Sequence, residues 1–252
     1  MRIKFNKEIE FLIKKIFFSE KYLLKRRLNR AIKNIYEDEL LILDKIVDKN
    51  LESVDVGVYR GVYTYKLSKI SKHVHAFEPN PLLFPHLNRN LKKIAENITL
   101  YENALSDTNS TTDLKIPKRF KTLNKKNYEE MYKLGSATIH KKNLLSNDDL
   151  VSLKVRTKKM DDILGNNNIG FIKIDVEGHE ENVLMGATEI IKKNRPILLV
   201  EIEQKHTRKN VEETINFINS LGYKSYFLSG SNLENTNKLK NYKDKNNYFF
   251  IK

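Results

Sequence analysis

The stretch FIKIDVEGHEE, residues 171–181, consists of a short apolar run that ends in a cluster of ionisable side chains. Lys173 interrupts the run, and Asp175, Glu177, His179 and Glu180 follow it around a single glycine. Burying a charge among apolar residues is costly unless a partner offsets it. The stretch therefore indicates a central strand with a functional site at its carboxyl end.

Length and composition fit one large α/β domain with an added helical or lid segment. The chain has 252 residues, of which 40% are hydrophobic and 31% charged, and it contains no cysteine. Disulfides and thiolate metal sites are therefore excluded. No run approaches the roughly 20 apolar residues of a membrane span, and the basic N-terminus lacks the pattern of a secretory signal. These features predict a cytoplasmic protein.

The chain is strongly basic, with a formal net charge of +14 and a pI near 9.6. Such a charge suits a polyanionic partner, such as nucleic acid, an anionic membrane surface or a phosphorylated substrate. Lysine and asparagine are abundant along the whole chain, however, which a general compositional bias also explains. Both interpretations stay open from the sequence.

Residues 1–49 are expected to be helical, because apolar side chains recur in them at helical spacing. The segment KYLLKRRLNR, residues 21–30, carries five basic residues. It fits a helix packed on the domain with a solvated outer face. It also fits an amphipathic helix that contacts the inner face of a membrane, or a contact in a homo-oligomer. Residues 50–252 are then the main domain.

From residue 50 onward, short strands alternate with helices. The strands are expected at 52–57, 73–78, 98–106, 168–175, 196–203, 223–228 and 246–252, and the helices at 62–70, 81–97, 179–193 and 209–220. This alternation predicts a mainly parallel sheet with helices on both faces. Residues 106–160 interrupt the alternation with short strands at 111–117, 136–140 and 151–157. With the lysine-rich residues 118–133 between them, they predict an inserted β-layer and a lid.

The first strand ends in DVGVYRG, residues 55–61, where ligands bind in open α/β sheets. About 20 residues later Glu78 ends the second strand, where a carboxylate can accept hydrogen bonds from both ribose hydroxyls. The turn lacks the G-x-G-x-x-G spacing of dinucleotide sites, and Asp55 would repel a pyrophosphate. S-adenosylmethionine carries cationic groups and no phosphate, so this turn favours S-adenosylmethionine over NAD.

Three segments, VDVGVYRG, AFEPNP and IKIDVEGHE, together with their surroundings over roughly residues 50–205, resemble the FkbM family of S-adenosylmethionine-dependent O-methyltransferases. The resemblance implies a class I methyltransferase fold, a Rossmann-like sheet of seven strands whose last strand is antiparallel. It also implies methylation of a hydroxyl, commonly on a sugar or a polyketide-type natural product. The chain departs from the family at Val58 and Tyr59, where a small residue and an asparagine are usual.

The resemblance also implies positions for the cofactor. The first turn would surround its methionine part, Glu78 would hold the ribose, and the end of the third strand would meet the adenine. The residues that we expect to bind the cofactor are Asp55, Gly57, Tyr59, Gly61, Glu78, Pro79, Asn80, Asn103, Ala104 and Ser136.

Methyl transfer to a weakly nucleophilic hydroxyl needs a group that takes its proton. Asp175 and His179 are candidates for this base, and Lys173 could orient Asp175 or form a structural ion pair with Glu201. In a second mechanism, Asp175 and Glu201 or Glu203, at adjacent strand ends, bind Mg²⁺ and acidify the hydroxyl. Both mechanisms stay open.

The leading functional hypothesis is an O-methyltransferase of a sugar, such as a nucleotide-activated sugar or a surface or capsular glycan. The basic segment 118–133 would suit phosphates on such a substrate. One alternative is methylation of a small natural product or lipid. A nucleic-acid-binding protein or RNA methyltransferase is the other, although the chain has neither an RNA-recognition motif nor an N-P-P-Y-type amine site.

Overall fold

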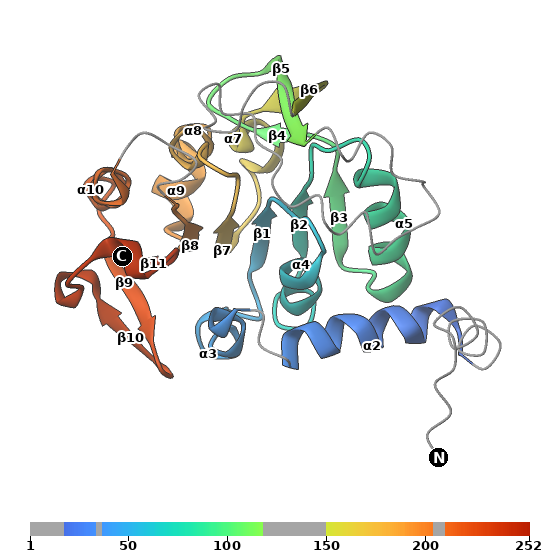
Figure 1. Cartoon of the computed structure of the whole chain (residues 1–252), viewed down its shortest axis with the longest axis horizontal. Helices are drawn as coiled ribbons and strands as arrows, with labels where there is room; N and C mark the ends of the chain where they lie inside the picture. Colours follow the sequence, from blue (N-terminus) through green and yellow to red (C-terminus); the bar gives the residue numbers. More distant parts are fainter. Residues whose placement is uncertain (1–17, 34–36, 118–149, 204–209) are drawn as a thin grey trace.

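A computed structural model describes residues 18–33, 37–117, 150–203 and 210–252. Its main sheet has eight strands in the order β10-β9-β11-β8-β7-β1-β2-β3 (Figure 1). Their bounds are β1 Glu52–Val56, β2 Val74–Phe77, β3 Ile98–Tyr101, β7 Ile169–Ile174, β8 Ile197–Glu201, β9 Lys224–Ser229, β10 Asn232–Asn235 and β11 Asn247–Ile251. In this sheet β3, β2, β1, β7 and β8 are parallel to one another, whereas β11 runs antiparallel to both β8 and β9.

The expected seven strands are thus one too few, while the antiparallel last strand is confirmed. The additional strand, β10, forms a hairpin with β9 in which Asn232 pairs with Ser229. The two-residue loop begins with Gly230, whose φ of +59° suits the first position of such a tight turn. A short polar stretch, NLEN, was not recognisable as a strand because its pairing depends on this turn.

A second sheet of three strands, in the order β4-β6-β5, lies beyond the upper end of the main sheet in Figure 1. It consists of β4 Ala104–Leu105, β5 Ser110–Pro117 and β6 Leu150–Lys158. The expected antiparallel strands at 111–117 and 151–157 are confirmed. The single strand expected at 98–106 was wrong, since β3 ends at Tyr101 and β4 pairs with β6 instead. Residues 118–133 and 136–140 lie outside the described residues.

Helices cover both faces of the main sheet, as predicted. One face carries α2 Glu20–Lys33, α3 Leu43–Ile46, α4 Val62–Leu67 and α5 Phe84–Ile94, and the other carries α7 Met160–Leu164, α8 Glu180–Met185, α9 Thr188–Asn194 and α10 Val211–Ser220. Three 3-10 helices complete the described chain: η1 Asp38–Leu41, η4 Thr236–Lys238 and η5 Tyr242–Asp244.

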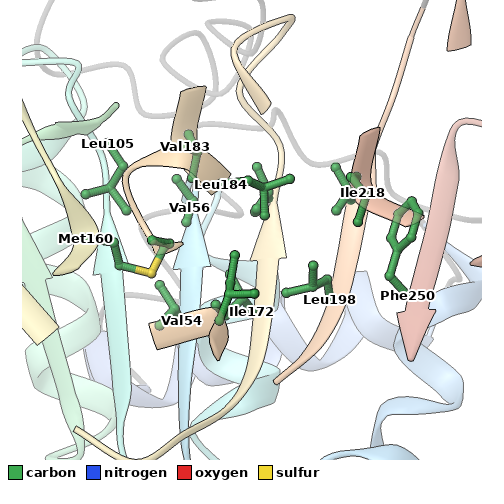
Figure 2. Close-up of a cluster of buried hydrophobic side chains, with 14 of the residues drawn as sticks. Val54, Val56, Leu105, Met160, Ile172, Val183, Leu184, Leu198, Ile218 and Phe250 are labelled. Carbon is green, nitrogen blue, oxygen red and sulfur yellow. The ribbon is translucent and has the colours of Figure 1, made fainter. Parts of the chain in front are cut away.

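Alternation along the strands divides the core between the two faces. Figure 2 shows Val54 and Val56 of β1 and Ile172 of β7 pointing toward Val183 and Leu184 of α8, and all five side chains are buried. The intervening positions of β1 and β7 are Asp55 and Lys173, which therefore point to the opposite face, under α4. Because the apolar side chains of β1 and β7 are buried against α8, Asp55 and Lys173 are fixed on the opposite face.

The helix expected at 179–193 is two helices, because the chain turns sharply at Gly186. A Cβ atom on Gly186 would lie 2.0 Å from the carbonyl oxygen of Ser106, so only glycine fits. The next helix, α9, is capped by Asp161, whose carboxylate accepts hydrogen bonds from the backbone N–H groups of Glu189 and Ile190, each at 3.0 Å. Contacts between distant segments, rather than local sequence, divide the helix.

Of the helical segment expected over 1–49, residues 1–17 and 34–36 lie outside the described residues, and Glu20–Lys33 forms α2, which packs on α4 and α5. Leu28 is buried against them, whereas Tyr22 is 48% exposed. No helix within the described ranges is long and apolar enough to cross a membrane.

Candidate active site

A solvent-open cleft lies at the carboxyl ends of β1, β2 and β7. This is where an open parallel sheet binds its ligands. The side chains and backbone that line the cleft are Val56, Gly57, Tyr59, Phe77, Glu78, Pro79, Leu83, Asn103, Ala104, Leu105, Leu114, Asp175, Val176 and Glu177. Six of the ten predicted cofactor residues are among them.

The first glycine turn joins two strand ends. Gly57 has a φ of +88°, and a Cβ atom there would lie only 1.9 Å from the carbonyl oxygen of Asp175. The backbone N–H of Asp175 in turn donates to the carbonyl of Val56 at 3.0 Å. We expected the glycine to allow close approach of a ligand. The structure shows that it also allows close approach of the neighbouring strand, which sets Asp175 at the edge of the cleft.

Asp55 lies directly behind this turn and is only 1% exposed. Its Oδ2 accepts a hydrogen bond from the Thr64 hydroxyl, while its Oδ1 has no hydrogen-bond partner among the described residues. Burial raises the pKa of Asp55 to about 6, although the nearby Lys173 ammonium opposes the rise. Asp55 does not itself line the cleft, but an acid with one unpartnered oxygen directly behind the glycine turn fits a ligand that carries a positive charge.

Glu78 reaches the cleft from the end of β2. Its two carboxylate oxygens accept hydrogen bonds from the backbone N–H groups of Tyr59, at 3.0 Å, and Asn80, at 2.9 Å. Burial raises the pKa of Glu78 to about 7 in spite of these bonds. Each oxygen has a second lone pair, so the fixed carboxylate can still accept from two hydroxyl groups of a ligand.

The adenine side of the predicted site is mostly apolar. Pro79, Asn103 and Ala104 line the cleft, as does Leu114 from β5 of the second sheet. Asn80 does not line it; its side chain is buried and accepts a hydrogen bond from a backbone N–H, which shapes the turn. Leu114 was not anticipated, because only the folding of β5 over the main sheet brings it there.

Lys173, Asp175 and Glu201 meet where β7 and β8 end. The Lys173 ammonium donates to Asp175 Oδ2 at 2.7 Å and lies beside Asp55 in the register of β1 and β7. Glu201 shares a hydrogen bond with Asp175. The side chain of Lys173 is 3% exposed, whereas that of Asp175 is 25% exposed and reaches the cleft.

The protonation states of this cluster follow from burial and charge. Burial by itself would lower the pKa of Lys173, but the carboxylates of Asp175 and Asp55 outweigh it and raise the pKa, so the ammonium stays charged. Burial, followed by the negative charge of Asp175, raises the pKa of Glu201 well above its usual range. The Glu201 carboxyl can therefore donate its proton to the Asp175 carboxylate in a hydrogen bond.

His179 lies at the start of α8 and points away from this cluster. Its Nε2 lies 2.9 Å from Ser106 Oγ, which donates to Asp107 at 2.9 Å, so Nε2 is the donor to the serine. Next to it, the buried Glu180 accepts from the backbone N–H of Gly178 at 2.8 Å. The bond to Ser106 ties the loop after β7 to the end of β4, and the histidine does not line the cleft.

The remaining predicted residues lie apart from the cleft. Gly61 begins α4 with a φ of +73° and packs against the Leu91 side chain. Glu203, a candidate metal ligand, accepts from the Asn246 side chain at 2.6 Å. Within the described ranges, no three His, Cys, Asp or Glu side chains are grouped so as to hold a metal ion. Ser136 lies outside the described residues.

Comparison with known proteins places most of the chain in one family. Residues 55–225 match the family model described as the methyltransferase FkbM domain. No curated protein matches the chain.

Solved structures agree with the fold. Methyltransferase FkbM from Methylobacillus flagellatus superposes with a TM-score of 0.52 at 17% identity, over 81% of this chain and 44% of its own. This chain therefore spans less than half the length of that protein. A putative methyltransferase from Streptococcus mutans in complex with SAH gives a TM-score of 0.44 at 12% identity, over 84% of this chain and 94% of its own. An rRNA methylase from Streptococcus thermophilus gives 0.46 at 12% identity, over 84% and 92%. The predicted class I methyltransferase fold is confirmed.

Proposed function

The chain belongs to the FkbM methyltransferase family, and we propose that it transfers a methyl group from S-adenosylmethionine to a hydroxyl of a sugar. The observation that carries the proposal is the charge of the cleft. Three carboxyl groups line it, those of Glu78, Asp175 and Glu177, while Asp55 lies buried behind the glycine turn and Glu201 is hydrogen-bonded to Asp175. This arrangement suits a cationic cofactor on one side and a hydroxyl to be deprotonated on the other.

The described residues fit S-adenosylmethionine. When bound, the cofactor supplies an electrophilic methyl group on a positively charged sulfur. Glu78 would hold the ribose hydroxyls through the lone pairs that its two backbone hydrogen bonds leave over. Asp55 would offset the positive charge of the methionine part, and the apolar wall that includes Leu114 would cover the adenine. A pyrophosphate would meet the Asp55 carboxyl, so NAD fits less well.

Asp175 is the base that the geometry favours. Of Lys173, Asp175 and Glu201 it is the one that lines the cleft, and the other two both hydrogen-bond its carboxylate. The Asp175 carboxylate would accept the proton of the acceptor hydroxyl as the hydroxyl oxygen displaces the cofactor's sulfur from the methyl carbon. The Lys173 ammonium and the Glu201 carboxyl fix the orientation of that carboxylate, and alignment of the reactants contributes the rest of the rate.

His179, the other predicted base, would act differently in this scheme. Its bond to Ser106 supports a role in positioning the loop that carries Asp175. The metal-assisted mechanism, with Mg²⁺ at Asp175 and Glu201 or Glu203, finds no support in the described part of the chain, where no three His, Cys, Asp or Glu side chains are grouped so as to hold a metal ion.

A sugar acceptor is supported by the family resemblance and by the Asp175 and Glu177 carboxyl groups in the cleft lining, since carboxylates accept hydrogen bonds from several hydroxyls at once. A nucleotide-activated sugar or a surface glycan would supply such hydroxyls. Methylation of a small natural product or lipid and methylation of RNA are the alternatives, and no feature of the described cleft favours either.

Calorimetric titration with S-adenosylhomocysteine, with NAD as control, tests the proposal first. We expect micromolar binding of S-adenosylhomocysteine and none of NAD; the reverse result would overturn it. Incubation with isotope-labelled S-adenosylmethionine and a panel of sugars, nucleotide sugars, lipids and RNA then identifies the acceptor. Label found only on RNA or only on lipid would reject a sugar as the methyl acceptor.

A further inference from the structure

Two residues outside the predicted site reach the charged cluster from the far side of the cleft. Tyr63, in the first turn of α4, is 7% exposed, and its hydroxyl donates to Glu37 Oε2 at 2.5 Å. Glu37 precedes η1, in the segment that leads into β1. The Lys173 ammonium lies 4.8 Å from the centre of the Tyr63 ring. A continuous set of contacts therefore runs from Glu37 through Tyr63 and Lys173 to Asp175.

Each contact limits the position of the next side chain. A buried ammonium on an aromatic face is attracted by the ring quadrupole, so Tyr63 holds Lys173 from the α4 side. Two carboxylates can pair with the Lys173 ammonium, because Asp55 lies beside it in the sheet and Asp175 lies nearer the cleft. The Tyr63 hydroxyl is itself fixed by its short bond to Glu37. Without that bond, both the ring and the ammonium gain freedom.

Glu37 acts on the cluster through its charge as well. Three charged groups act on Glu201: Asp175 and Lys173 from the neighbouring strand end of β7, and Glu37. After burial and Asp175, Glu37 is a further cause of the raised pKa of Glu201, and it also raises the pKa of Lys173. Burial, and then the charge of Glu37, raises the pKa of Tyr63, so its hydroxyl remains a donor.

We infer that Glu37 and Tyr63 are positioning residues of the methyl transfer, which hold the Lys173 ammonium in place beside Asp175 and Glu201. The inference rests on the proposed function and extends it. It makes the segment before β1 a part of the reaction centre, in addition to any role of α2 in membrane or subunit contact. Neither residue touches the acceptor in this role; both act through Lys173.

Titration of Glu201 is the test, because a merely structural role would not move it. The protein is labelled with ¹³C at the glutamate side-chain carboxyls, and the Glu201 signal is assigned with a Glu201→Gln variant. In Glu37→Gln the amide oxygen can still accept from Tyr63 while the charge is lost. We expect the Glu201 midpoint to fall by about half a pH unit or more. Tyr63→Phe keeps every charge but frees the Lys173 ammonium, which lowers the pKa of Glu201, so in this variant the midpoint should rise.

Asp38→Asn is the matched control, since it removes the same charge one residue away from an exposed side chain. Its Glu201 midpoint should equal that of the wild type. An unchanged midpoint in both Glu37→Gln and Tyr63→Phe would overturn the inference, as would an equal shift in Asp38→Asn. Should Glu37→Gln fail to fold, Tyr63→Phe decides alone.

The same proteins separate this inference from the proposed function. S-adenosylhomocysteine binding should be the same in the wild type, Glu37→Gln and Tyr63→Phe, because neither residue lines the cofactor cleft. Absence of binding in the wild type would reject the proposed function, whatever the Glu201 titration gives. Normal binding with an unmoved Glu201 midpoint would reject the inference alone.

Discussion

Gly57 shows how one residue determines the shape of the site. Its positive φ and the carbonyl of Asp175, 1.9 Å from the position of a Cβ atom, leave no room for a side chain. We predict that Gly57→Ala loses several kcal/mol of unfolding free energy and most of its S-adenosylhomocysteine affinity, because the ends of β1 and β7 must separate. Urea unfolding and calorimetry measure the two effects.

Gly230→Ala is the matched control for this substitution. Gly230 also has a positive φ, +59°, but nothing lies within 4 Å of its Cβ position. Only backbone strain of about 1 kcal/mol is then expected, with unchanged affinity. Equal losses in the two variants would mean that the close contact with Asp175 is not the cause.

Glu78 has a cofactor role that can be separated from its structural one. In Glu78→Gln one side-chain oxygen remains as an acceptor, whereas Glu78→Ala removes both. We predict that S-adenosylhomocysteine affinity falls roughly 10-fold in the first and 100-fold in the second, since each charged hydrogen bond contributes about 1.5–3 kcal/mol. Calorimetry gives the dissociation constants. Glu96→Ala, a substitution at an exposed position, should bind S-adenosylhomocysteine normally. Normal binding by Glu78→Ala would show that Glu78 does not bind the ribose.

At the scale of elements, the strand ends were predictable and the breaks were not. Asp55, Glu78 and Asp175 each follow a short apolar run, and the structure brings all three to one edge of the sheet. The division of 98–106 and of 179–193 depends on a contact between Ser106 and Gly186, which are far apart in the sequence. Leu114 and Glu37 were missed for the same reason, as no local pattern indicates which distant element will reach a site.

The break before α9 gives a prediction about Asp161. Its carboxylate accepts two backbone N–H groups at the start of α9, so we predict that Asp161→Ala lowers the unfolding free energy by about 1–2 kcal/mol. Urea unfolding measures the loss. Asp162→Ala, which removes an exposed bond to Asn109, should lose less than half as much. A larger loss at Asp162 would contradict the assignment of Asp161 as the cap.

For the whole molecule, the net charge of +14 was plain from the sequence, but its meaning still depends on where the charges lie. The structure exposes Arg26 and Arg30 on the outer side of α2, near the exposed, stacked rings of Phe18 and Tyr22. Membrane contact through this helix and assembly into a homo-oligomer stay predictions. The basic segment 118–133 lies outside the described residues, so its role as a lid stays a prediction too.

Three buried acids give the ligand-free protein an unusual dependence of stability on pH. Burial raises the pKa of Asp55 to about 6 and those of Glu78 and Glu180 to about 7, from 3.8 and 4.5. A raised pKa means that the folded state binds the proton more tightly than the unfolded chain. The stabilisation is therefore complete below about pH 4 and is lost as the pH rises through 6 and 7.

We predict that the unfolding free energy, measured with urea at unit steps of pH, falls by several kcal/mol from pH 5 to pH 8. Each acid contributes a slope of about 1.4 kcal/mol per pH unit where it is neutral only in the folded state. His86, whose pKa burial lowers to about 4, has the opposite effect between pH 4 and 6.5 and offsets about one acid. The glutamine in Glu78→Gln cannot ionise, so the unfolding free energy of this variant should fall less steeply with pH, by the slope that Glu78 contributes in the wild type. A stability that stays level or rises from pH 5 to pH 8 would show that these carboxyls are ionised in the folded protein.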